Sequence, residues 1–364
     1  ISDVRNESSP TGVPAKIEIL LDAPGRLPWS GRMAEYALPA IHQAIQEART
    51  TLVFVNTRAQ AELVFQGLWR LNEAGLPIAL HHGSLAVEQR RKVEAAMAAG
   101  RLRAVVATSS LDLGVDWGSV DLVVQVGAPK GLSRLLQRVS RAGHGLDRAS
   151  RSLLVPANRF EYLECRAALA ALADGVLDGL EPGPGGLDVL AQHILGTACA
   201  GPFNPDALYA EVRHAQPYAD LARRDFDDAL AFVVDGGYAL GGYDRFRRLT
   251  RLADGRLRLA HPRVARLHRM NIGTIVEATT MRVQLRGGAV LGEVEEYFIQ
   301  GLAPGDTFVF AGETLRFEGA RDLTAIVTRA GGGEPKVPAY VGGRLPLSSP
   351  LAARVRALIA DPSR

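Results

Sequence analysis

The chain has 364 residues, enough for two or three domains, each with a core of its own. Apolar residues make up 47% and charged residues 22%, which is typical of a globular protein and excludes a disordered one. The net charge is +3 and the isoelectric point about 9.0, which permits a polyanionic partner without requiring one. No apolar run approaches the roughly 18 residues of a membrane span, and no signal peptide is recognisable.

Two cysteines, Cys165 and Cys199, lie far apart and lack the spacing of a metal site. We interpret them as reduced thiols of a cytosolic protein, and we predict no metal site. The chain starts without methionine and contains no Gly-x-x-x-x-Gly-Lys-Ser/Thr pattern. We therefore expect it to be a piece of a longer protein.

Strands and helices are predicted to alternate in the first 180 residues. Apolar runs predict strands at 16–21, 51–55, 78–82, 104–108 and 120–126, with helices at 35–48, at 59–71 and after Gly83-Ser84. Apolar strands alternating with helices are typical of a parallel sheet covered on both faces. Polar loops follow four of these strands, beginning at Asn56, His82, Thr108 and Gly127. Because such loops gather at one edge of a parallel sheet, they indicate a binding site.

The segment Gln-Arg-Val-Ser-Arg-Ala-Gly-His, 137–144, places Arg138 and Arg141 three residues apart on a predicted helix. Arginine suits phosphoryl transfer, because its planar fork can make two hydrogen bonds to a phosphate and its charge is permanent. A solvated basic helix face is the alternative for an isolated Arg-x-x-Arg. The order of the segments upstream favours the phosphate role.

The composition changes at 181–186, where Glu-Pro-Gly-Pro-Gly-Gly predicts a linker. Three predicted helices follow, at 187–200, 205–214 and 223–234, and then a two-stranded ribbon over 243–259 that turns at Asp254-Gly255. This order indicates a winged helix. The ribbon carries Arg245, Arg247, Arg248, Arg251, Arg256 and Arg258. A basic ribbon of this kind points to nucleic acid, with a solvated hairpin as the alternative.

From residue 271 onwards, short predicted strands at 272–278, 281–285, 307–310 and 324–327 are separated by glycine and proline. This pattern predicts a small β barrel-like domain over 271–349. The last residues, 350–364, are predicted to start a helix that the chain truncates. The predicted domains are therefore 1–180, 181–270 and 271–349, followed by this helix.

Taken in order, the loops of the first domain resemble motifs IV, IVa, V and VI in the second RecA-like lobe of superfamily 2 helicases. The matching segments are 52–58, 81–85, 107–116 and 137–144. The doubled histidine before Gly-Ser, the Leu-Asp-Leu-Gly-Val-Asp of motif V and the final His144 of motif VI narrow the resemblance to the Lhr type. Within that type the chain is most similar to bacterial ligase-associated DEXH-box DNA helicases. The resemblance continues at 187–193, 271–276 and 304–306.

The resemblance implies an α/β fold, in which a second RecA-like lobe precedes the winged helix and the β barrel-like domain. It implies a motor that uses ATP and Mg to move 3′ to 5′ on single-stranded DNA, with a DNA-repair role. The first lobe, with the phosphate loop and the DExH box, would lie outside this chain, which should not hydrolyse ATP alone. The implied partners are that lobe, single-stranded DNA or a 3′-tailed duplex, an RNA–DNA hybrid as an alternative, and a repair ligase or nuclease. The implied location is the bacterial cytoplasm, at the nucleoid, without a membrane.

Specific residues follow from the same resemblance. Arg141 is the expected arginine finger, and Arg138 either assists it at the phosphate or braces the lobe interface. The residues implied to contact the nucleotide are Gln137, Gly114, Asp116 and His144. Asp116 would bind the ribose, with a turn cap as the alternative. Two positions depart from the family pattern, since Ser140 stands in place of Gly and His144 in place of Arg.

The residues implied to bind DNA are Asn56, Thr57, Arg58, His82, Gly83, Ser84, Thr108, Ser109, Arg223, Arg224, Arg247 and Arg248. Hydroxyl groups and free N–H groups at helix starts bind phosphate without reading sequence. Thr57, Ser84 and Ser109 could equally be helix N-caps. The neighbours His81 and His82 should point to opposite faces of their strand, which argues against a metal pair. A different class of function, a stand-alone DNA-binding or regulatory module without catalysis, stays open.

Overall fold

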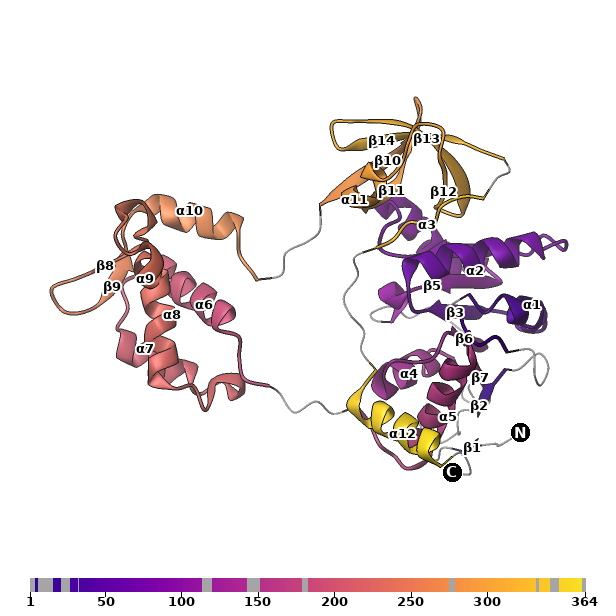
Figure 1. Ribbon diagram of the computed structural model, residues 1–364, viewed down its shortest axis with the longest axis horizontal. Coiled ribbons are helices and arrows are strands. Elements are labelled where there is room, and N and C mark those ends of the chain that lie inside the picture. Colours follow the sequence, from indigo (N-terminus) through magenta and orange to yellow (C-terminus); the bar gives the residue numbers. More distant parts are fainter. Residues whose placement is uncertain are drawn as a thin grey trace. The chain divides into compact units, whose positions relative to one another are not determined.

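The computed structural model divides into two compact units (Figure 1). It describes residues 4–5, 16–20, 27–31, 33–112, 120–142, 151–178, 183–274, 279–331, 334–340 and 347–361. The first unit combines Ile1–Asp178 with Ala278–Arg364, and the second unit is Gly179–Glu277. The second unit is therefore an insertion into the chain of the first, and the strands predicted after residue 280 belong to the first unit.

A seven-stranded sheet lies at the centre of the first unit, in the order β1-β2-β7-β6-β3-β5-β4. Its strands are β1 (Val4–Arg5), β2 (Lys16–Ile19), β3 (Thr51–Val55), β4 (Ile78–His81), β5 (Ala104–Ala107), β6 (Leu122–Val126) and β7 (Arg151–Val155). The six strands β2, β7, β6, β3, β5 and β4 are parallel to one another, and β1 pairs with β2 in the antiparallel direction. The predicted parallel sheet is confirmed, with β1 and β7 as strands that the sequence pattern did not show.

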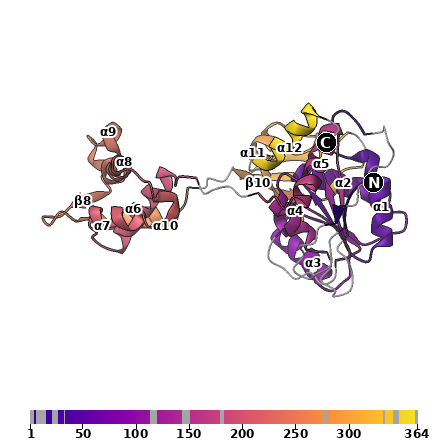
Figure 2. The ribbon, with the colours of Figure 1, turned by 90° about the horizontal axis from the view of Figure 1, so that it is seen from below.

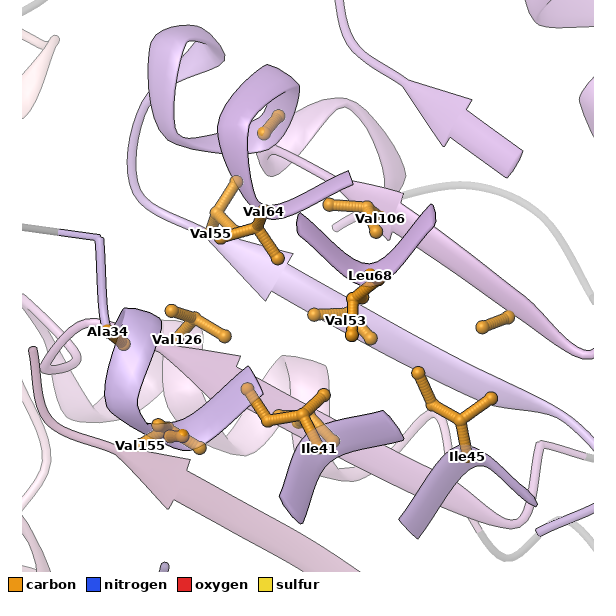
Figure 3. Packing of buried hydrophobic residues seen from close by; sticks show 14 of the residues in the cluster. Ala34, Ile41, Ile45, Val53, Val55, Val64, Leu68, Val106, Val126 and Val155 are labelled. Atoms are coloured by element: carbon orange, nitrogen blue, oxygen red, sulfur yellow. The ribbon is translucent and has the colours of Figure 1, made fainter. Parts of the chain in front are cut away.

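Helices cover both faces of this sheet. On one face α1 (Leu38–Glu47), preceded by η1 (Glu35–Ala37), and α2 (Arg58–Arg70) pack against alternate strand residues. Figure 3 shows Ile41 of α1 and Leu68 of α2 against Val53 on β3. The intervening residues Leu52 and Phe54 point to the opposite face, because strand side chains alternate. Every residue of β3 is consequently buried.

The opposite face is covered by α3 (Val87–Ala98), η2 (Ser109–Leu111), α4 (Leu132–Val139) and α5 (Arg159–Ala173). The C-terminal helix α12 (Ser349–Ala360) packs against α5, as Figures 1 and 2 both show. Its buried residues Leu351 and Leu358 join the same core as Leu169. The helix predicted from residue 350 thus packs onto this core, and it ends at Ala360, whereas the prediction had the chain truncate it.

A second, mixed sheet of five strands forms an open, curled half-barrel with a core of its own. Its order is β11-β10-β14-β13-β12, with β10 (Thr280–Leu285), β11 (Val290–Glu295), β12 (Thr307–Phe310), β13 (Glu313–Arg321) and β14 (Thr324–Arg329), and the short α11 (Glu296–Gln300) follows β11. The predicted strand at 272–278 is wrong for 272–274, which form a bend, and its remaining residues lie outside those described.

The half-barrel joins the parallel-sheet domain through main-chain hydrogen bonds. The N–H of Ala86 donates to the Leu291 carbonyl at 3.0 Å, and the N–H of Glu293 donates to the Ser84 carbonyl at 2.8 Å. A Cβ at Gly292 would lie 2.0 Å from the Ser84 carbonyl oxygen, so only glycine permits this approach. The loop after β4 is therefore tied to β11.

The second unit has the three predicted helices in order and a hairpin, but the hairpin strands lie within 249–259, so Arg245, Arg247 and Arg248 of the predicted ribbon precede it. It contains α6 (Leu187–Ala200), α7 (Pro205–Val212), η3 (Gln216–Tyr218), α8 (Arg223–Asp235), α9 (Gly237–Leu240), η4 (Asp244–Phe246), β8 (Leu249–Arg251), β9 (Leu257–Leu259) and α10 (Pro262–Met270). Fully buried Phe226 of α8 packs among Ile194, Leu249 and Leu257. Leu249 and Leu257 belong to the hairpin strands, so the hairpin is anchored in the helical core.

Across the described ranges, no helix combines the length and the apolar character that crossing a membrane would require. Both cysteines are free. Burial raises the pKa of the Cys165 thiol well above its ordinary value, so this thiol stays protonated.

Candidate functional site at the carboxyl edge of the sheet

The polar loops predicted to converge do lie next to one another. Strands β6, β3, β5 and β4 are adjacent and parallel, so the residues that follow them share one edge of the sheet. Asn56 follows β3 and donates through Nδ2 to the Ala128 carbonyl at 3.0 Å. Buried Gln125, near the end of β6, donates to Asn56 Oδ1 at 3.3 Å. The loops after β3 and β6 are therefore bound to each other.

Arg138 lies inside this edge and not on its surface. The side chain is 4% exposed, and its Nε and Nη2 donate to the two carboxylate oxygens of Asp112 at 2.8 Å and 3.1 Å. Its Nη1 donates to Gln125 Oε1 at 2.6 Å, and the guanidinium stacks on the ring of Phe54 at 4.7 Å. This burial does not fit a direct phosphate contact. The bonds hold α4 to β6 and to the loop after β5 within this domain, while the predicted brace of the lobe interface stays a prediction.

Arg141 lies two residues beyond the end of α4 and is half-buried. Its Nη2 donates to the main-chain carbonyl of Asp112 at 2.6 Å. This bond holds the guanidinium beside the loop that follows β5, at the carboxyl edge of the sheet. Gln137, on the same helix, is exposed. The other predicted nucleotide contacts, Gly114, Asp116 and His144, lie outside the described residues.

Asp112 is the residue that sequence reasoning missed. It is 5% exposed, binds Arg138 and Arg141 as described, and lies 3.6 Å from Nε of Arg134. The available signal was an acidic residue inside the motif V segment, which could have been matched to the arginines of motif VI. A buried carboxylate needs such cationic partners, because burial of an unpaired charge is unfavourable.

Arg58 and Ser84, both predicted to bind DNA, bind each other. Arg58 Nη1 donates to Ser84 Oγ at 2.7 Å, lies 3.8 Å from buried Glu295, and its guanidinium stacks on Tyr340 at 4.9 Å. Ser84 is 6% exposed and is not the cap of α3, which starts at Val87 after Ala86. These side chains therefore link the loop after β4 to the half-barrel.

His82 is fully buried, so the prediction that it contacts DNA does not fit the structure. Its Nε2 lies 3.0 Å from Oε1 of Glu62, which is also fully buried. Glu62 additionally accepts from the N–H groups of Ala311 and Gly312 at 2.6 Å and 2.7 Å. Both residues have positive φ, 56° and 78°, and consecutive residues of this kind aim their N–H groups at one anion. Glu62 thus ties α2 to the turn between β12 and β13.

Among the remaining predicted DNA contacts, Thr57, Gly83 and Ser109 are exposed at the sheet edge. Thr57 is the N-cap of α2 and accepts from the Gln60 N–H at 3.1 Å, as one of the two predictions had it. Thr108 is 8% exposed, with its hydroxyl 3.5 Å from Ser110. A DNA strand at this edge would therefore meet Thr57, Gly83 and Ser109 first.

His81 and His82 point to different partners, as expected for neighbours on a strand. Nδ1 of His81 lies 2.9 Å from Ser110 Oγ, and Nε2 lies 3.0 Å from Glu94 Oε1. Burial lowers the pKa of His81 below its ordinary value, although Glu94 opposes this shift. Among the described residues, no group of three or more His, Cys, Asp or Glu side chains could hold a metal ion.

In the second unit, three of the four predicted DNA-binding arginines are paired with carboxylates. Arg223 binds Asp206 and Asp227 at 2.7 Å and 2.9 Å. Arg224 lies 3.8 Å from Asp228, and Arg247 lies 3.6 Å from Asp244. The fourth, Arg248, is exposed. Three of the four arginines therefore have a carboxylate nearby, and their contact with DNA stays a prediction.

Two family models match the chain. The helicase conserved C-terminal domain matches residues 36–145, and the winged helix domain of the large helicase-related protein matches residues 170–337. The ATP-dependent helicase Lhr-Core of Methanothermobacter thermautotrophicus is 36% identical over 320 residues, which are 87% of this chain and 37% of that protein. The chain belongs to the Lhr family of helicases. The Lhr helicase/uracil glycosylase of Escherichia coli is 31% identical over 86% of this chain and 23% of its own length.

Solved structures agree with this assignment. The structure of Mycobacterium smegmatis helicase Lhr bound to ssDNA and AMP-PNP has a TM-score of 0.62 and 33% identity, and the match covers 73% of this chain and 34% of that one. Helicase MrfA bound to DNA has a TM-score of 0.65 at 17% identity, which supports the fold alone. The chain spans a little over a third of the archaeal Lhr-Core relatives that it matches.

Proposed function

We propose that this Lhr-family chain is the part of an ATP-dependent DNA helicase that supplies the arginine finger and grips the DNA. The observation that carries the proposal is the placement of Arg141, half-buried at the carboxyl edge of the sheet and held there by the Asp112 carbonyl. The named activity of the relatives and the ssDNA and AMP-PNP bound to the mycobacterial Lhr support it.

In this proposal the two arginines of motif VI have different roles. Arg138 fixes the end of α4 through its buried pair with Asp112, and Arg141 presents its guanidinium to the nucleotide phosphates. A guanidinium is effective there because it stabilises the charge that develops on the transferred phosphoryl group, an effect of roughly 10³–10⁵ in rate. ATP supplies that group and would be held with Mg mainly by another lobe of the protein. Gln137, Gly114, Asp116 and His144 are the further proposed nucleotide contacts.

The DNA strand would cross the edge formed by Thr57, Gly83 and Ser109, where hydroxyl and N–H groups can bind phosphates without reading bases. At the same edge Thr108 is buried and Asn56 and Arg58 are half-buried. By family resemblance we propose 3′ to 5′ translocation on single-stranded DNA, a DNA-repair role and the ligase-associated subtype. The proposed partners are the first RecA-like lobe and a repair ligase or nuclease.

The test is to mix the chain with a separately prepared nucleotide-binding lobe of an Lhr relative. We expect ATP hydrolysis that depends on single-stranded DNA and falls by about a thousandfold or more with Arg141→Ala, in line with the effect of arginine fingers. Arg91→Ala, at an exposed position on α3, is the matched control and should leave the rate unchanged. Equal rates for the two variants would refute the finger. DNA binding without hydrolysis under any condition would indicate a non-catalytic module.

A further inference from the structure

The strongest concentration of positive charge in the chain lies in the second unit. Residues 245–269 contain nine arginines and a single acidic residue, Asp254. This stretch alone therefore has a formal charge of +8, whereas the whole chain has +3. It forms the hairpin β8–β9 and ends in the helix α10. Charge clustered on one short segment is what a polyanion would recognise.

Helix α10 separates its half-buried side chains from its arginines. Val264 packs against the core of the unit, and half-buried His268 lies one turn further on the same side, near Gly196 of α6. Arg263, Arg266 and Arg269 are spaced three residues apart and are all exposed. At about 100° per residue they occupy a face about 120° wide, centred opposite Val264 and His268. The row is about 9 Å long, since a helix rises about 1.5 Å per residue.

These arginines differ from those of α8 in their surroundings. Arg223 and Arg224 each have an aspartate within reach on their own helix. No carboxylate of the described residues forms an ion pair with Arg263, Arg266 or Arg269. Since α10 itself contains no acidic residue, its charge is not neutralised locally.

Apolar side chains accompany the row. Leu267 is 47% exposed and Met270 is 74% exposed, and both lie beside the arginines on the outward side of α10. Exposed apolar groups of this kind can contact base faces directly in a single strand, whereas in a duplex they must first unstack neighbouring base pairs, which is unfavourable. The combination of cations and apolar groups therefore fits a single strand better than it fits a duplex.

We propose that the outward face of α10, formed by Arg263, Arg266, Leu267, Arg269 and Met270, is a binding surface for single-stranded nucleic acid. The arginines neutralise successive phosphates, and the two apolar side chains contact bases. This inference rests on the proposed function and adds a strand-binding surface in the second unit. The carboxylate-paired arginines of α8 are not part of it.

Fluorescence anisotropy of the full chain with labelled oligothymidine, over a series of salt concentrations, tests the surface. We expect the variant Arg263→Ala/Arg266→Ala/Arg269→Ala to lose on the order of tenfold or more in affinity. The slope of log affinity against log salt should become shallower by about 0.7 for each phosphate that is no longer neutralised, and so by about 2 in total. Unchanged circular dichroism and melting temperature show that the variant is folded.

Arg321→Ala/Arg329→Ala is the matched control, because these exposed arginines of the half-barrel have the carboxylate partners Asp322 and Glu313. We expect it to change affinity less than twofold. The triple variant should lose less affinity for a blunt duplex of the same length than for the single strand. The proposed surface is overturned if the triple variant binds the single strand with unchanged affinity. It is also overturned if the control variant loses as much single-strand affinity as the triple variant, or if the triple variant loses more affinity for the duplex than for the single strand. The motor is judged separately by hydrolysis and Arg141→Ala, so it can stand when this surface fails.

Discussion

Asp112 holds Arg138 through both of its carboxylate oxygens, at 2.8 Å and 3.1 Å, in a pair that is almost fully buried. The two residues come from segments that resemble motifs V and VI, 26 positions apart. Because the main chain of Asp112 also binds Arg141, the pair sets the position of the proposed finger relative to the sheet edge. A substitution in either motif should therefore alter the position of residues in the other.

Arg138→Met should strongly destabilise the first unit. It leaves the Asp112 carboxylate buried without its main partner, and breaking a buried pair in this way costs about 3–5 kcal/mol. Arg134→Met is the control, because Arg134 is 40% exposed and 3.6 Å from Asp112, and it should cost below about 1 kcal/mol. Urea unfolding measures both variants. Similar costs for the two would show that the buried pair does not brace motif VI.

Glu62→Gln should loosen the attachment of the half-barrel to α2. The charged carboxylate accepts from two N–H groups and faces His82, and an amide nitrogen in place of one oxygen would confront a donor. Loss of a hydrogen bond to a buried charged group costs about 1.5–3 kcal/mol. Glu73→Gln, at an exposed position just beyond α2, should leave the unfolding midpoint unchanged. The same midpoint for Glu62→Gln and the wild type would contradict this role.

Gly312→Ala should destabilise the same attachment more than Gly287→Ala does. Both glycines have positive φ, 78° and 66°, so each substitution carries a backbone cost of about 1–2 kcal/mol. Only at Gly312 would the new Cβ also crowd a side chain, since it would lie 2.6 Å from the ring of Phe65. At Gly287 the space is open. Thermal unfolding of the two variants gives the comparison, and equal melting temperatures would argue against tight packing of Phe65.

Acidification should weaken the first unit through His81. Burial lowers its pKa in the folded state below the ordinary value of 6.5, so the unfolded chain binds the proton more readily. The stability due to neutral His81 is therefore complete above pH 6.5 and is lost as the pH falls through the lowered folded-state pKa. Glu94, Arg90 and His82 are the charged or titratable groups that act on it.

Urea unfolding at a series of pH values, for the wild type and His81→Gln, measures this contribution. The decline in unfolding free energy below pH 6.5 should be smaller in the variant, which has no imidazole at this position. Parallel pH profiles for the two proteins would exclude His81 as the cause.

The sequence predicted those parts of the fold in which local pattern and tertiary role coincide. Strand β3 was predicted with its observed bounds, because a fully buried parallel strand is apolar throughout. Strand β13 was missed, because its residues alternate only partly and its partners lie on β12 and β14. Charge was the least predictable property. Arg58 resembles a free cation in the sequence, yet Glu295 of β11 lies beside it in space, whereas the pair of Arg223 with Asp227 is an i,i+4 pair within one predicted helix.

The interruption of the first unit by the second bears on how the protein is made. When the ribosome has released residues up to 178, Glu62 still lacks the turn at Ala311 and Gly312, and α5 still lacks α12. The hydrophobic core of the winged-helix segment is formed by residues of that segment. Domains generally fold as units during synthesis. We therefore expect the inserted segment to reach its native state before the half-barrel strands and α12 of the first unit have been synthesised.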